Sequence, residues 1–78
     1  MNKIDTRLEI QMSLHPGDTF DVIITLMEGT DMQAMGLPEH RVLMHNIVAA
    51  SLKADQLCAL SKMEYVLAVE PDGPVGIM

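Results

Sequence analysis

The sequence predicts an α+β domain, in which a small antiparallel sheet carries two helices on one face. Short segments in which apolar and polar residues alternate predict the strands, and two segments with helical signals predict the helices. Only short connections separate these segments, and a small sheet covered by helices on one face is the economical arrangement for such an order. With 78 residues the chain forms a single domain, residues 1–78, of which residues 71–78 are an extended C-terminal tail.

The first part of the chain predicts two strands joined by a turn. Residues 7–14 alternate between apolar and polar side chains, as in a half-buried strand, with Leu8, Ile10, Met12 and Leu14 on one side. Residues 15–18 contain Pro and Gly, which favour a turn. Residues 19–27 are rich in β-branched side chains and apolar on both faces in the middle, so they predict a central strand.

The second part predicts two helices and two further extended segments, giving the order β-β-α-β-α-β. A short helix is expected over residues 30–36. Residues 41–52 fit neither period, but their β-branched side chains favour extended chain with an irregularity near residues 45–46; an amphipathic helix is the competing prediction. Residues 53–63 predict a helix from apolar residues at three-residue spacing, and residues 65–69 predict the last strand.

The composition excludes several classes of function. The chain carries a formal net charge of −6 and has five basic residues without a basic cluster, so neither nucleic acid nor a membrane is a predicted partner. The single cysteine, Cys58, rules out an internal disulfide, and its place in a helical pattern favours a small buried or half-buried hydrophobe over a reactive thiol.

No group of residues predicts an enzyme, a cofactor or a metal site. Glu70 and Asp72 are the candidate carboxylates, but no companion His, Lys or nucleophile lies within sequence reach, so we assign no catalytic residue. His15, His40 and His45 are not spaced for one face of a helix or strand, and we predict no metal ligands among them.

The C-terminal segment is the most informative part of the chain. A predicted strand ends in Glu70 and Asp72, which point the same way on extended backbone because they are two residues apart. The tail that follows is stiffened by proline and ends on the apolar residue Met78, whereas chain termini are usually polar. Such a tail either packs against its own domain or enters the cleft of another protein.

Residues 46–72 resemble the C-terminal half of subtilisin-type propeptides and their stand-alone protease-inhibitor relatives. The shared features are a strand ending in Ala-Ala-Ser-Leu, a short helix with Leu-x-x-Leu and a strand ending in Val-Glu-x-Asp. The resemblance implies a ferredoxin-like fold, a four-stranded antiparallel sheet with two helices on one face. The predicted strand at residues 7–14 departs from the family pattern, where it is either additional or replaces a missing strand.

The resemblance implies a propeptide-like inhibitor or folding helper of a subtilisin-like serine protease. Glu70 and Asp72 would contact the N-terminal ends of two surface helices of the protease, where unpaired N–H groups favour a carboxylate. The tail would run extended through the substrate cleft, with Met78 in the primary specificity pocket and Val75 in the apolar pocket three residues upstream. The cleft-binding residues implied are Pro74, Val75, Gly76, Ile77 and Met78.

An alternative function is a small homo-oligomeric interaction or structural domain, such as a homodimer, in which the tail and residues 7–14 form the subunit contacts.

The predicted cellular location depends on whether the chain is an excised propeptide. No signal peptide is found in the sequence, which predicts a cytoplasmic protein, whereas an excised propeptide would be secreted.

Overall fold

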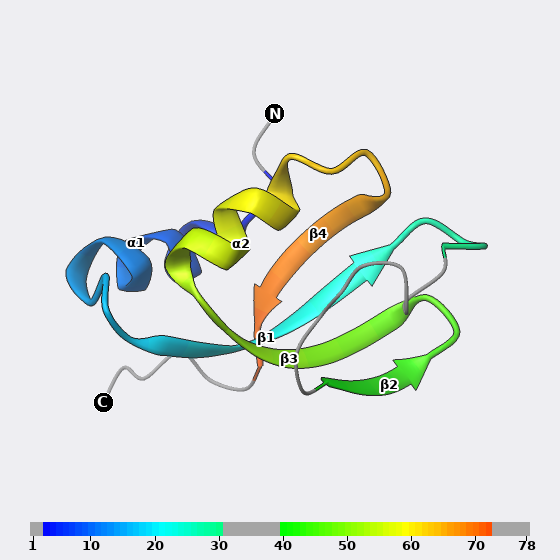
Figure 1. The fold of residues 1–78 in the computed structure, drawn as a ribbon, viewed down its shortest axis with the longest axis horizontal. Helices are drawn as coiled ribbons and strands as arrows, with labels where there is room; N and C mark the ends of the chain where they lie inside the picture. Colours follow the sequence, from blue (N-terminus) through cyan, green and yellow to red (C-terminus); the bar gives the residue numbers. More distant parts are fainter. Residues whose placement is uncertain (1–2, 31–39, 73–78) are drawn as a thin grey trace.

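The fold is an α+β domain with one layer of helices on one antiparallel sheet. The computed structural model describes residues 3–30 and 40–72. The elements are α1 (Thr6–Leu14), β1 (Thr19–Leu26), β2 (His40–Met44), β3 (Ile47–Lys53), α2 (Ala54–Ser61) and β4 (Val66–Pro71). The sheet has the order β2-β3-β1-β4, and both helices lie on the same face of it (Figure 1). The predicted ferredoxin-like fold class is therefore confirmed.

Residues 7–14 belong to a helix, α1, and the strand predicted there is wrong. Leu8 and Met12, which are one helical turn apart, are buried, whereas Ile10 and Leu14 are exposed. A strand would have placed all four on one face. The segment is rich in strong helix formers, including Arg, Leu, Glu, Gln and Met, and this local preference decides the structure.

The residues before α1 pair with the sheet and then start the helix. The Val69 N–H donates to the Lys3 carbonyl at 2.8 Å, and the Asp5 N–H donates to the Val69 carbonyl at 2.9 Å. Lys3 Nζ also donates to the Met63 carbonyl at 2.6 Å. The Asp5 side chain then accepts from the Arg7 backbone N–H at 2.8 Å, which caps α1 and lowers the pKa of the Asp5 carboxyl. These bonds cover the outer edge of β4.

The hydrophobic core lies between the helices and the sheet, and β1 is its central element. Alternate residues of β1 face the helices, and Val22, Ile24 and Leu26 are each 0% exposed. The strand predicted over residues 19–27 is confirmed as β1. The rest of the core cluster is formed by Ile4, Leu8, Met12, Val48, Ala50, Leu52, Leu57, Leu60, Val66 and Val69.

Two later elements agree with the sequence in type but not in every detail. The helix predicted over residues 53–63 is α2, and the strand predicted over residues 65–69 is β4. Pro71 belongs to the strand as its last residue rather than lying beyond it. Cys58 is exposed on α2, so its expected burial is wrong.

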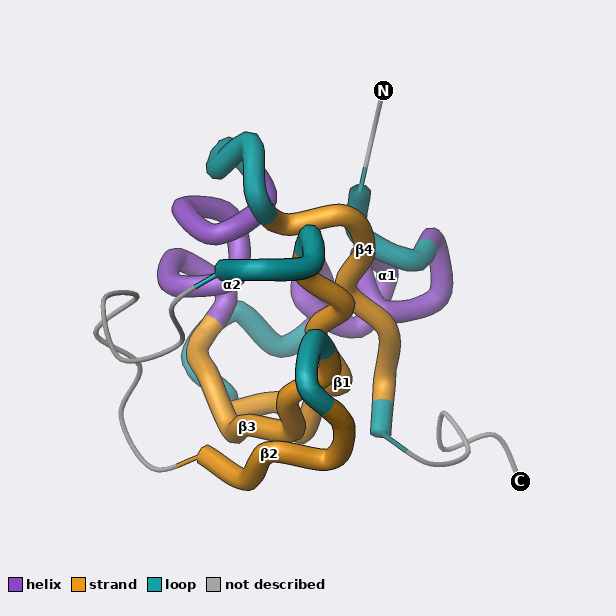
Figure 2. Tube along the Cα trace, turned by 90° about the vertical axis from the view of Figure 1, so that its right-hand side faces the viewer, coloured by secondary structure: helices purple, strands orange, loops and turns teal. Residues whose placement is uncertain are grey.

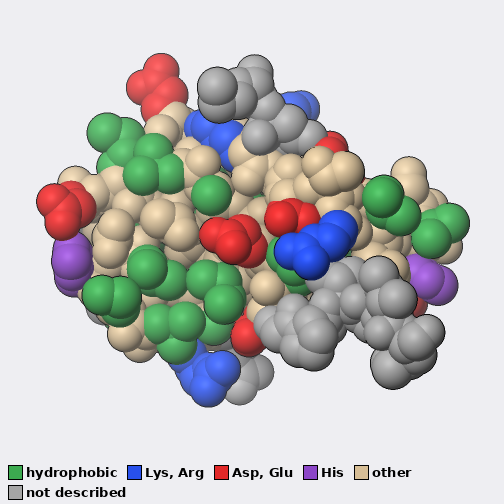
Figure 3. Space-filling model, turned by 180° about the vertical axis from the view of Figure 1, so that it is seen from behind, with side chains coloured by type: hydrophobic (Ala, Val, Ile, Leu, Met, Phe, Trp, Pro, Cys, Tyr) green, Lys and Arg blue, Asp and Glu red, His purple; other side chains and the backbone are tan. Residues whose placement is uncertain are grey.

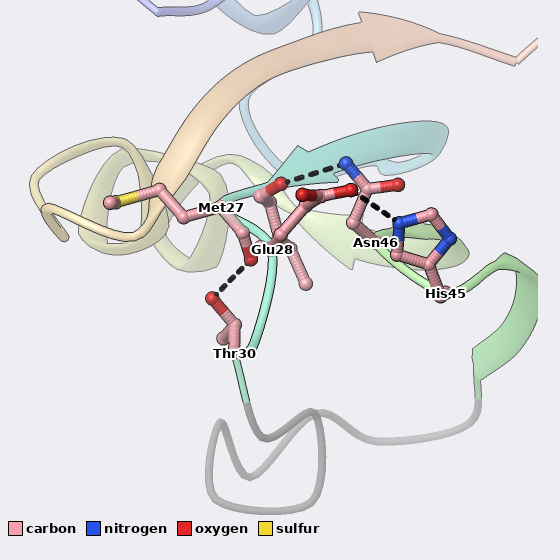
Figure 4. A network of polar contacts seen from close by, with 6 residues as sticks. Met27, Glu28, Thr30, His45 and Asn46 are labelled. Atoms are coloured by element: carbon pink, nitrogen blue, oxygen red, sulfur yellow. Dashed lines mark hydrogen bonds and ion pairs between the residues drawn. The ribbon is translucent and has the colours of Figure 1, made fainter.

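β2 and β3 form a hairpin, and the irregularity predicted near residues 45–46 is the turn of that hairpin. The turn is tied to the end of β1 (Figure 4). Asn46 Nδ2 donates to the Leu26 carbonyl at 3.1 Å, and the Leu26 N–H donates to the Asn46 carbonyl at 2.8 Å. On the surface, His45 Nε2 lies 2.8 Å from Glu28 Oε1. The competing helix over this part of the chain is wrong.

The order of elements in the described residues differs from the predicted β-β-α-β-α-β because it begins with a helix. β1 and β2 are both antiparallel to β3, so they run parallel to each other on its two sides. Apart from Thr30, the short helix expected over residues 30–36 lies outside the described residues.

Truncation of Leu8 tests α1 directly. Leu8 is 2% exposed, so Leu8→Ala should leave a cavity, lowering the free energy of unfolding by about 2–4 kcal/mol. The matched change Ile10→Ala, at a position 52% exposed, should lower it by less than about 1 kcal/mol. Urea denaturation followed by circular dichroism measures both values. Equal losses at the two positions would contradict the helix and favour a strand.

Asn46 should matter more for stability than its neighbour in the same turn. Asn46→Ala removes a donor to a part-buried carbonyl and should lower the free energy of unfolding by about 1 kcal/mol. His45→Ala removes only a surface contact with Glu28 and should change it by less than about 0.5 kcal/mol. Thermal and urea denaturation of both variants give the comparison, and the reverse order would show that the surface pair holds the turn.

Candidate functional site

The face of the sheet opposite the helices is apolar on the outward residues Ile23 of β1 and Ile47 and Ala49 of β3, the two central strands, and we call this region the apolar middle. Ile23 and Thr25 of β1 point to this face, because the residues between them point into the core. On one side the strand register places Ala49 beside Ile23 and Ile47 beside Thr25. On the other side Ala68 of β4 pairs with Thr25. In the view from behind, hydrophobic side chains gather toward the end that carries the β2–β3 turn, at the lower left of Figure 3.

The same face is acidic where β4 ends. Glu70 pairs with Ile23, which places its exposed side chain beside the apolar middle. Asp72 follows the strand, and its N–H donates to the Asp21 carbonyl at 2.9 Å. Asp21 lies on the same face and accepts a hydrogen bond from Ser51 Oγ. This part of the face therefore carries three carboxylates. Glu70 lies among the last residues of β4, Asp72 lies just beyond its end, and Asp21 lies on the neighbouring part of β1.

A shallow open depression of about 380 Å³ adjoins this acidic end. Arg41, which pairs with Ala49 across β2 and β3, brings a cation to it. The residues that line the depression are Asp21, His40, Arg41, Ala49, Ala50, Ser51 and Asp72. The small side chains of β3 leave space between the charged groups. Because the depression is open and largely polar, it fits contacts with a protein surface better than enclosure of a small ligand.

The structure brings the two predicted docking carboxylates, Glu70 and Asp72, to one end of one face. Within the described residues neither forms an ion pair. The predicted cleft-binding residues Pro74, Val75, Gly76, Ile77 and Met78 lie outside the described residues.

Sequence reasoning missed Asp21, Ser51 and Arg41 as members of this site. They come from three different strands, and only the pairing register places them together. The available signal was weak: Asp21 is a polar residue at an outward position of a strand that is otherwise largely apolar.

Of the three histidines, His40 lines the depression, whereas His15 and His45 lie elsewhere. His15 lies 3.8 Å from Asp18 in the turn before β1, and His45 contacts Glu28 at the other end of the sheet. In the two described segments no three His, Cys, Asp or Glu side chains are grouped so that they could hold a metal ion. No helix in those segments is long and apolar enough to cross a membrane.

Comparison of the chain with protein-family models, with curated proteins and with solved structures finds no match.

The predicted docking carboxylates should not contribute to folding. Because Glu70 and Asp72 are exposed and form no ion pair in the described part of the chain, Glu70→Gln and Asp72→Asn should each change the free energy of unfolding by less than about 0.5 kcal/mol. Urea denaturation near neutral pH tests this. A loss well above that value would mean that these carboxylates support the fold instead of a partner contact.

Proposed function

We propose that this protein is a propeptide-like inhibitor or folding helper of a subtilisin-like serine protease. The helix-free face of the sheet docks on surface helices of the protease, and the C-terminal residues enter its substrate cleft. The observation that supports this most is the position of Glu70, whose exposed side chain lies at the border between the apolar middle of that face and its acidic end.

The charges of the acidic end suit the N-termini of helices. The first turn of a helix has unpaired N–H groups and about half a positive charge, which together favour a carboxylate. Glu70 and Asp72 can each accept such N–H groups without first breaking an ion pair in the described residues. The apolar middle, with Ile23 and Ile47, then packs against the sides of the docked helices.

The sequence position of the tail supports the proposal. Residues 73–78 follow Asp72 directly in the chain, and Asp72 lies at the acidic end of the sheet. Six extended residues span at most about 20 Å, which is enough to reach from a docking surface into an adjacent cleft. Pro74 restricts the free chain, and the other residues have backbone groups that can pair with the edge strands of a cleft.

Inhibition of a broad-specificity subtilisin tests the proposal. The intact chain should inhibit, and removal of residues 75–78 should abolish inhibition while the circular dichroism spectrum stays that of a folded domain. Glu70→Gln and Asp72→Asn should each raise the inhibition constant by a factor of about 1.7 to 5, because a carboxylate at a helix N-terminus contributes about 0.3–1 kcal/mol.

Glu64→Gln is the matched control, because Glu64 is an exposed carboxylate between α2 and β4, away from the acidic end. This variant should inhibit as well as the original chain. The proposal is wrong if the intact chain has no effect on the protease, or if the truncated chain inhibits equally well.

A further inference from the structure

The two edges of the sheet differ in how they are protected. The outer edge of β4 is paired with the backbone of residues 3–5 through Val69 and ends in Pro71, which has no N–H to donate. β2 forms the opposite edge, as the end-on view shows (Figure 2). Among the described residues no strand pairs with its outer side. An edge of this kind can pair with another strand.

The composition of β2 also favours association. Val42, Leu43 and Met44 are three consecutive apolar residues, and they are 57%, 48% and 57% exposed. β2 contains no Asp or Glu, although the chain as a whole carries a net charge of −6. Two copies of this strand can therefore approach without carboxylates meeting directly.

We infer that β2 is a dimer interface, at which it pairs antiparallel with β2 of a second copy of this chain. A strand that pairs antiparallel with itself generates a two-fold axis perpendicular to the sheet. The two four-stranded sheets then join into one continuous sheet, and the helices of both copies lie on the same face. The register shift between Val42 and Met44 limits the length of regular pairing, so we expect a weak dimer.

Charge complementarity supports a second copy as the occupant. Antiparallel pairing places the start of β2 in one copy beside the end of β2 in the other. Arg41 of one copy then lies near the β2–β3 turn of the other, where Glu28 contacts His45. In the described residues Arg41 has no ion pair within its own chain. The two-fold axis forms this Arg41 to Glu28 contact twice.

The dimer does not use the two carboxylates of the proposed inhibitor function, although Arg41 lines the depression beside Asp72. β2 and β4 are at opposite edges of the sheet. Pairing through β2 therefore leaves Glu70 and Asp72 free in both copies, and the test of one idea does not decide the other.

Sedimentation equilibrium at chain concentrations from about 5 to 500 µM tests the interface. The original chain should change from monomer to dimer in this range. Val42→Lys places a charge in the centre of β2 and should abolish the dimer, whereas Leu67→Lys, on the exposed part of β4, should leave it unchanged. Urea denaturation shows whether each variant is folded.

Exchanging the charges of Arg41 and Glu28 distinguishes the proposed contact between them from a general effect of surface charge on the dimer. Arg41→Glu and Glu28→Arg should each weaken the dimer about tenfold, and the double variant should recover most of the lost affinity. A monomer at every concentration would overturn the inference. Loss of the dimer in Leu67→Lys but not in Val42→Lys, or a double variant no better than the single ones, would overturn it as well.

Discussion

The pairing of β1 with strands on both sides is the constraint on which the rest of the structure depends. β1 pairs with β3 through residues 19–25 and with β4 through residues 22–26. Its inward side chains Val22, Ile24 and Leu26 are completely buried, so a shift by one residue would exchange them with outward residues such as Asp21. The same register that forms the core also fixes which residues meet on the helix-free face.

The site is therefore a product of tertiary pairing. Glu70 and Asp72 could be selected from sequence because they are close together at the end of one predicted strand. The sequence could not select Asp21, Ser51 and Arg41, because the local pattern of residues does not show which strands are neighbours in the sheet. Once β1 lies between β3 and β4, the outward positions of three strands converge on one depression.

The sequence was sufficient for the fold class, for β1, for α2 and for β4, because each has a clear period or composition. The sequence pattern predicted a strand in place of α1, because Leu8, Ile10, Met12 and Leu14 alternate with polar residues as in a strand. Burial follows the helical spacing of Leu8 and Met12, and the Asp5 cap is a local signal for that helix. The hairpin turn at residues 45–46 was visible only as a break in pattern, because its stabilising bonds come from Leu26, far away in sequence.

The contact of the N-terminal residues with the last strand also sets an order of events during synthesis. Lys3 bonds to Met63, 60 positions later in the chain, and its backbone bonds to Val69. Residues 3–5 must therefore wait for Met63 and Val69 to be synthesised before they find their partners, and β1 must wait for β4 in the same way. We expect little stable structure in a nascent chain that lacks β4, and folding that proceeds in one late step once that strand has emerged.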